Sequence, residues 1–139
     1  MSSDVVVFSN PTQGDYERAK DKARELLRSV LPEHAWLEFE DRGVIRLAGK
    51  RGVYVISSYS QTEICDSSSG KCVAYACLQL SIPAPTCDRM VAEYLLIRNA
   101  EGVYWKTANI FFCNEHAFGI GTLLLIAFDI ALFVKILFL

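Results

Sequence analysis

A nearly uninterrupted apolar run, residues 118–139, constrains this 139-residue chain more than any other feature of its sequence. Fifteen of the 22 residues in the run are Leu, Ile, Phe or Val. A helix of that length spans about 33 Å, which is enough to cross the roughly 30 Å hydrocarbon core of a bilayer. These side chains contribute about −5 to −9 kcal/mol to insertion, and Asp129 opposes it by about 3 kcal/mol. We therefore expect one C-terminal transmembrane helix over these residues.

Polar and small residues inside the run indicate contact with another helix. An ionisable side chain at mid-membrane usually faces protein or water, and Thr122 lies on the same helical stripe as Asp129, seven residues earlier. A neighbouring stripe places small residues at steps of four, which permits close helix approach. A protein partner or a second copy of the chain is therefore expected to pack here, through Thr122, Ala127, Asp129, Ala131 and Lys135. The alternative, a protonated Asp129 without function, stays open.

The same run is compatible with a soluble structural subunit of a large assembly, in which it would be a helix buried between neighbours. Such a helix would normally show an amphipathic period. Residues 123–128 are apolar on every face of a helix, so the sequence favours membrane lipid as the surroundings. The soluble subunit is kept as the alternative.

The N-terminal residues lack the pattern of a secretory signal. Asp4 stands where basic residues would be expected, and only residues 5–8 form an unbroken apolar stretch, which is shorter than a signal requires. We therefore expect the N-terminal domain to stay in the cytoplasm and the chain to cross the membrane once.

Charge and length predict one domain before the apolar run. Nearly all charged residues precede residue 117, and the formal net charge of −2 with a pI near 5.7 argues against a general polyanion-binding surface, so no specific nucleic acid partner is expected. The expected division is a flexible N-terminus (1–14), a compact domain (15–112), a juxtamembrane link (113–117) and the transmembrane tail (118–139).

Periodicity within the domain predicts an α+β fold, a small antiparallel sheet flanked by helices. Apolar residues at steps of three and four predict a helix capped by Asp15 that ends at Pro32. A short second helix is expected from Glu33 to about Glu40, with Gly43 following as a natural stop. Branched and aromatic residues then predict four short strands joined as a meander, with the sequence DSSSG at the best hairpin turn. The expected strands are residues 44–48, 53–58, 62–65 and 71–80.

A second helical part follows the strands. Thr86 or Asp88 is expected to cap a helix that runs to Arg98, and a short helical segment is expected over residues 103–108. Trp105, Phe111 and Phe112 precede the tail, where they would either form an aromatic belt at a membrane interface or close the domain core.

Basic residues gather around the first expected hairpin. This local cluster would contact anionic lipid head groups or a nucleic acid backbone, whereas the simpler interpretation is a solvated hairpin tip. The residues concerned are Arg42, Arg46, Lys50 and Arg51.

No motif predicts catalysis, a cofactor or a metal. Four of the five cysteines, Cys65, Cys72, Cys77 and Cys87, lack the paired spacing of structural zinc sites, and core thiols are the ordinary interpretation. Cys72 and Cys77 would point to opposite faces of an unbulged strand, and a cross-hairpin Cys65–Cys72 disulfide would require oxidising conditions. The histidines, His34 and His116, accompany no nucleophile motif.

Three stretches resemble a family of small uncharacterised bacterial proteins. They are ARELLRSVLPEH, the hairpin ending in GVYVI, and IPAPTCDRMVAEYLLIRNAEGVYWKTAN, within residues 23–109. The resemblance implies a helix, a hairpin sheet and a helix that begins at an Asp and ends near Ala108 and Asn109. It implies no activity or site residue, and the apolar tail departs from the family pattern.

The sequence thus predicts a non-enzymatic, tail-anchored membrane protein, an accessory or partner-binding subunit of a larger complex. The soluble assembly subunit described above is the alternative. A thiol- or zinc-dependent regulator is a third interpretation.

Overall fold

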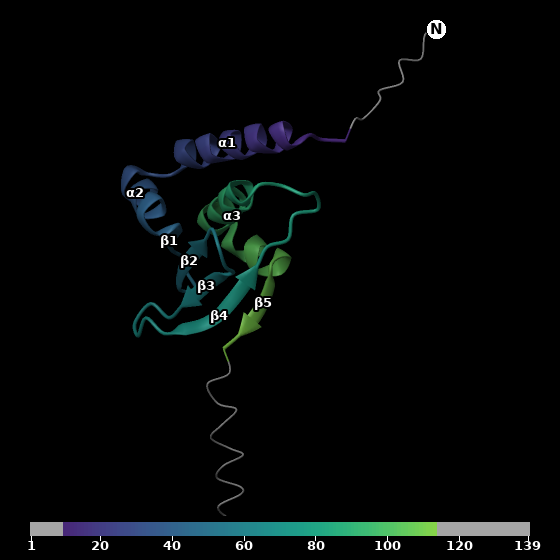
Figure 1. The fold of residues 1–139 in the computed structure, drawn as a ribbon. Helices are drawn as coiled ribbons and strands as arrows, with labels where there is room; N and C mark the ends of the chain where they lie inside the picture. The colour runs from purple at the N-terminus through teal and green to yellow at the C-terminus, as the bar shows by residue number, and fades with distance from the viewer. Residues whose placement is uncertain (1–9, 114–139) are drawn as a thin grey trace, which may run out of the picture.

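The computed structural model describes residues 10–113. The expected transmembrane helix, with the helix-contact residues Thr122, Ala127, Asp129, Ala131 and Lys135, lies outside the described residues. The elements follow in the order α1 (Gln13–Val30), α2 (Glu33–Arg42), β1 (Val44–Ala48), β2 (Val53–Ser57), β3 (Thr62–Cys65), β4 (Cys72–Cys77), α3 (Thr86–Thr107) and β5 (Asn109–Phe112) (Figure 1). The α+β prediction with a small antiparallel sheet is confirmed.

Five antiparallel strands form one sheet in the order β1-β2-β3-β4-β5. The expected meander of four strands is confirmed, and so is the hairpin turn at DSSSG. There the Asp66 carboxylate accepts hydrogen bonds from the backbone amides of Ser68 and Ser69, at 3.0 and 2.7 Å. The Ser68 hydroxyl also donates a hydrogen bond to this carboxylate. These hydrogen bonds, of which the one from the Ser68 hydroxyl has the largest effect, hold the pKa of Asp66 far below its usual range. The fifth strand, β5, was not expected from the sequence.

Particular residues cap the two N-terminal helices. The prediction that Asp15 caps α1 was wrong: the cap is Thr12, whose hydroxyl accepts from the Asp15 amide while the Asp15 carboxylate accepts from the Thr12 amide. Pro32 precedes α2, and Gly43 ends it with a left-handed φ of 68°. Glycine adopts this conformation without steric cost, so the predicted stop at Gly43 is confirmed.

Helix α3 differs from the expectation at both ends. Its cap is Pro85, with no side-chain hydrogen bond, so neither Thr86 nor Asp88 caps it. The backbone leaves helical geometry at Ala100, with φ −149° and ψ 54°, and then continues as a helix to Thr107. The two expected helices are therefore the two arms of one kinked helix.

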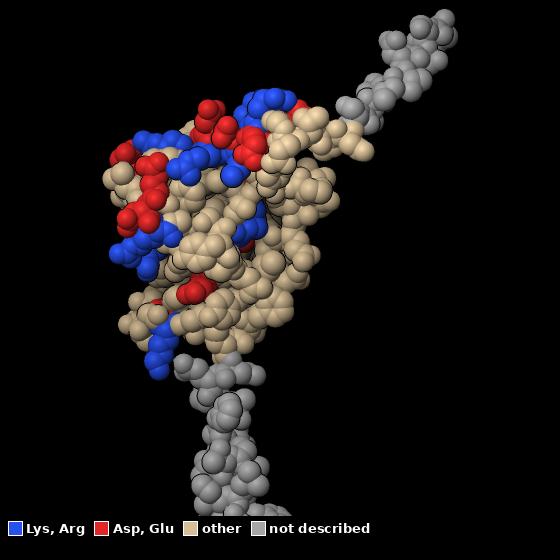
Figure 2. All heavy atoms as spheres, in the orientation of Figure 1, with Lys and Arg blue, Asp and Glu red and all other residues tan. Residues whose placement is uncertain are grey.

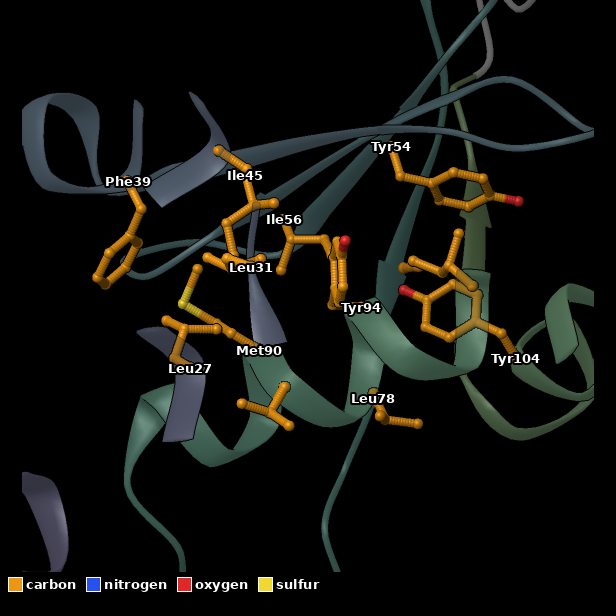
Figure 3. Close-up of a cluster of buried hydrophobic side chains, with 14 of the residues drawn as sticks. Leu27, Leu31, Phe39, Ile45, Tyr54, Ile56, Leu78, Met90, Tyr94 and Tyr104 are labelled. Carbon is orange, nitrogen blue, oxygen red and sulfur yellow. The ribbon is translucent and has the colours of Figure 1, made fainter. Parts of the chain in front are cut away.

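The helices pack in layers on the sheet. Helix α3 contacts β1, β2 and β5, α1 lies across α3, and α2 packs against β1 (Figure 1). Figure 3 shows side chains from all three helices and the sheet meeting in one core, among them Leu27, Phe39, Ile56 and Met90.

The other face of the sheet is open within the described residues. Buried residues such as Ile56, Ile64 and Ala76 alternate along the strands with more exposed ones. The register places one such exposed or half-buried residue beside the next in a row across all five strands. That row is Arg46, Val55, Glu63, Tyr75 and Phe111.

Candidate functional site

Three distant segments meet near the end of β5: the tip of the β1–β2 hairpin, the second arm of α3, and β5 itself. The Arg51 guanidinium carbon lies 4.7 Å from the centroid of the Trp105 ring. The Trp105 and Phe112 ring centroids are 6.3 Å apart. We call Arg51, Trp105 and Phe112 the aromatic–basic cluster. A cation over an indole face and two neighbouring aromatic rings each add an attraction beyond the area that they bury.

Glu101 fastens the hairpin tip to α3. Its carboxylate accepts hydrogen bonds from the backbone amides of Lys50 and Arg51, both at 3.0 Å, and from the Tyr54 hydroxyl at 2.6 Å. The Trp105 indole N–H in turn donates to the Tyr54 hydroxyl at 2.7 Å. The orientation of Trp105 is therefore fixed by a chain of polar contacts that begins at the hairpin.

Gly49 makes this close approach possible. A Cβ atom at this position would lie 2.5 Å from Oε1 of Glu101 and 2.6 Å from Cε2 of Tyr54. Both separations are far below van der Waals contact, so any side chain here would displace the carboxylate or the tyrosine ring. The glycine of the GKRG turn thus serves packing.

Hydrogen bonding keeps Glu101 charged. Partial burial raises its pKa, but the hydrogen bonds from Tyr54 and from the Arg51 and Lys50 amides outweigh burial, and the net pKa is lowered. Burial, followed by the hydrogen bond to Glu101, raises the pKa of Tyr54, which therefore remains a neutral donor. The site presents an ionised carboxylate that its own neighbours satisfy, beneath two exposed cationic side chains, Lys50 and Arg51.

Only half of the expected basic cluster comes together. Lys50 and Arg51 share the hairpin tip, but Arg42 lies at the other end of β1, next to Asp41 at 3.5 Å. Arg46 lies on the open face of the sheet and pairs with Glu38 at 2.8 Å. An extended strand separates its residues by about 3.3 Å each, so residues that are close in sequence end far apart along β1. The four basic residues therefore do not gather at one place, and contact of Lys50 and Arg51 with an anionic surface stays a prediction.

The aromatic residues before the tail do not close the core. Phe111 and Phe112 are 54% and 70% exposed, whereas Trp105 is half-buried against the core. Lys106 is exposed beside Trp105. In Figure 2 charged side chains gather over α1 and α2, while the side on which β4 and β5 lie is mostly uncharged in this view. The end of β5 therefore offers apolar surface with a basic border.

A second polar site, which sequence reasoning missed, is buried at the centre of α3. Glu93 is fully buried and accepts hydrogen bonds from Thr62 Oγ1 at 2.7 Å, Arg89 Nη1 at 2.9 Å and the Tyr104 hydroxyl at 3.4 Å. Arg89 also donates to the Ser57 carbonyl at 2.6 Å. Burial raises the pKa of Glu93 in spite of these bonds. Because its hydrogen-bonding partners are groups of the fold itself, we interpret this site as structural.

The sequence held a signal for this buried carboxylate. Glu93 follows Met90 by three residues and precedes Ile97 by four, which places it on the buried stripe of α3. Arg89 lies four residues before it, at the spacing of a helical ion pair. An acidic residue on an apolar stripe with a basic residue at this spacing predicts a buried pair.

The remaining chemical candidates lie apart. His34 is exposed on α2, and His116 lies outside the described residues. All five cysteines are thiols, and one pair of sulfur atoms, those of Cys72 and Cys113, is only 3.1 Å apart. Within residues 10–113 no three His, Cys, Asp or Glu side chains are grouped so that they could hold a metal ion.

Comparison with known proteins identifies no relative. The chain matches no family model, and neither a curated protein nor a solved structure is significantly similar to it. The resemblance to a bacterial family therefore stays a prediction. No helix between residues 10 and 113 combines the length and the apolar composition that a bilayer crossing requires.

Proposed function

We propose that this protein is a tail-anchored membrane protein whose domain lies on the cytoplasmic side with the aromatic–basic cluster against the lipid surface. Its role would be non-enzymatic, that of an accessory or partner-binding subunit of a larger complex. The observation that carries the proposal is the position of the cluster. Phe112 and Trp105 meet at the end of β5, and the apolar run of residues 118–139 begins only five residues after Cys113.

Chain length limits how far the cluster can lie from the membrane. Five residues reach at most about 18 Å even when fully extended. If residues 118–139 cross the bilayer, the end of β5 must lie within that distance of the point where they enter it. The interfacial layer of a bilayer adds about 5 to 8 Å on each side of the hydrocarbon core, so the cluster is within reach of lipid head groups.

The composition of the cluster suits a lipid surface. Tryptophan is enriched at membrane interfaces because its ring is apolar and its N–H is polar, and basic side chains are attracted to anionic lipids of the cytoplasmic leaflet. Within the cluster Arg51 supplies the cation and Phe112 supplies exposed apolar area, and the exposed Lys50 adds a second cation next to Arg51. We therefore propose that a lipid surface covers this patch.

The tail would provide the contact with a partner. Asp129 is costly in a bilayer unless it faces protein or water, and the small residues Ala127 and Ala131 would let another helix approach closely. Replacing Asp129 with Leu should reduce assembly of the chain in mild detergent, and unchanged assembly would remove this part of the proposal.

Membrane fractionation tests the anchor. The full chain should stay with membranes through alkaline extraction, and a truncation that ends at His116 should be released. Release of the full chain without detergent would instead support the soluble subunit with its tail buried between neighbours.

The two tryptophans test the orientation of the domain. Trp36 packs with Phe39 on α2, whereas Trp105 belongs to the aromatic–basic cluster. In vesicles that contain the full chain and brominated lipid, the Trp36→Phe variant should lose much of its fluorescence, because Trp105 lies near lipid. The matched Trp105→Phe variant should be quenched little. Equal quenching of the two variants would contradict the orientation while leaving the anchor itself standing.

A further inference from the structure

Cys72 and Cys113 form an unusually close pair of thiols across two neighbouring strands. Their Sγ atoms are 3.1 Å apart, and the Cys72 thiol also lies 3.5 Å from the Ala74 carbonyl oxygen, to which it donates. The Cys113 amide donates to the Val73 carbonyl at 2.9 Å, which extends the pairing of β4 and β5 by one residue. Both side chains are half-buried and are therefore accessible to a small reagent.

A bulge creates this pair. Ile64 pairs with Ala74, but Cys65 pairs with Cys72, so the register shifts by one residue between them. Without the shift, Cys72 would point into the core with Ala74. With the shift, Cys72 lies on the open face of the sheet. Cys113 lies on the same face, because it is two residues after Phe111 and every second residue of a strand shares a face. Cys72 and Cys77 thus share a face, in contrast to the expectation for an unbulged strand.

We propose that Cys72 and Cys113 are a dithiol–disulfide couple that fastens the edge strand β5 to β4. A disulfide needs its sulfur atoms about 2.05 Å apart, so each sulfur must move by only about 0.5 Å. The oxidant is a low-molecular-weight disulfide. One thiolate attacks it and releases one small thiol, and the second thiolate then attacks the mixed disulfide and releases the other. Two protein thiols are oxidised, and one small disulfide is reduced to two thiols.

The consequence is mechanical. β5 has four residues, pairs with β4 alone among the described strands, and ends at the residue before Cys113. A covalent bond there would hold the last part of the domain before the apolar run. This inference does not depend on where residues 118–139 reside, so it stands or falls separately from the membrane proposal.

Fragment mapping of the full chain in mild detergent tests the couple. The protein is incubated with excess glutathione disulfide, alkylated with N-ethylmaleimide, and digested with trypsin and chymotrypsin. Cleavage after Lys71 and Tyr75 gives the fragment CVAY, and cleavage after Phe112 and Phe118 gives CNEHAF. We expect these two fragments to be linked before reduction and separate after it. Two of the five thiols should escape alkylation.

Matched variants complete the test. Cys77→Ser should still lose two thiols on oxidation, whereas Cys72→Ser and Cys113→Ser should lose none to an internal bond. Amide exchange in residues 109–113 should slow by about tenfold in oxidised wild type. A dominant Cys65–Cys72 link, or mixed disulfides with glutathione and no protein cross-link, would overturn the proposal. Because the wild-type fragments decide the pairing, the result holds even if a variant fails to fold.

Discussion

Two glutamates of α3, eight residues apart, have opposite surroundings. Glu93 is fully buried and gathers Thr62, Arg89 and Tyr104 around it, and burial raises its pKa. Glu101 lies beyond the kink at Ala100 and is only partly buried; its pKa is lowered, because hydrogen bonds from Tyr54 and two hairpin amides outweigh that burial. The same side chain therefore serves the core in one arm of the helix and a surface loop in the other.

This difference indicates which of the two side chains can be replaced without unfolding the domain. Removing Glu93 leaves buried donors without an acceptor, and this cost lowers the stability of the whole fold. Removing Glu101 exposes hairpin amides that water can satisfy. The first region is therefore a requirement of the fold, and the second region positions a surface, the aromatic–basic cluster.

The largest effect is expected for Glu93→Ala. The free energy of unfolding should fall by about 3 kcal/mol, because Arg89 and Thr62 lose a buried acceptor. Denaturation of the full chain in mild detergent, followed by tryptophan fluorescence, measures it. Glu93→Gln is the milder control, since its amide oxygen can still accept from Thr62. A loss below about 1 kcal/mol for the alanine variant would show that the buried site is not essential to the fold.

A smaller effect is expected for Glu101→Ala. The free energy of unfolding should fall by about 1 to 2 kcal/mol, because three hydrogen bonds to a charged group are lost but their donors become hydrated. The Trp105 emission should shift to longer wavelength as the cluster loosens. Glu17→Ala, which removes an exposed carboxylate on α1, serves as the control and should change neither quantity. A loss of stability as large as that of Glu93→Ala would show that the two glutamates do not differ in their importance for the fold.

Two glycines beside Glu101 should respond with opposite sign. Gly49→Ala places a Cβ against Glu101 and Tyr54 and should destabilise the protein by about 1 kcal/mol. Gly102→Ala, in the second arm of α3 with open space around its Cα, should stabilise it by about 0.5 to 1 kcal/mol through helix propensity. Denaturation curves of both variants decide this. Stabilisation by Gly49→Ala would mean that the hairpin does not need its close approach to α3.

The smallest effect is expected for the pH dependence, because only the difference in protons bound by each carboxyl between the folded and unfolded states contributes to it. The pKa of Glu101 is lowered from 4.5, so the advantage of wild type over Glu101→Gln should be present above pH 4.5 and be lost as pH falls below it. The pKa of Glu93 is raised from 4.5, so the advantage of wild type over Glu93→Gln should be greatest below pH 4.5 and should decline as pH rises. Denaturation midpoints from pH 3.5 to 7 measure both, and parallel trends would contradict the assigned surroundings.

Local signals made most of the elements predictable. Pro32 and Gly43 bound α2, and the Asp66–Gly70 turn joins β3 to β4, because caps and turns depend on a few neighbouring residues. The strand β5, which was not predicted, had no such signal. Its four residues pair with β4, from which the whole of α3 separates them in the sequence. An edge strand of this length is defined by its partner more than by its own residues.

The candidate site was predictable only in its parts. Lys50, Arg51, Trp105 and Phe112 were each noticed in the sequence, but the hairpin tip and β5 are some 60 residues apart. They are joined through the second arm of α3, where Glu101 and Trp105 contact the hairpin and Trp105 contacts Phe112. The pairing of Cys72 with Cys113 likewise depends on a one-residue bulge, which no local composition announces.

The sequence by itself determined the helices, the order of the first four strands, and the apolar run that motivates the membrane proposal, because periodicity and turn chemistry act over a few residues. Tertiary structure alone decided which thiols touch and which cation joins the aromatic residues at the end of β5. Those contacts form between residues that are distant along the chain. The pairing of β5 with β4 brings the two thiols together, and the packing of α3 brings Trp105 to the hairpin cation Arg51.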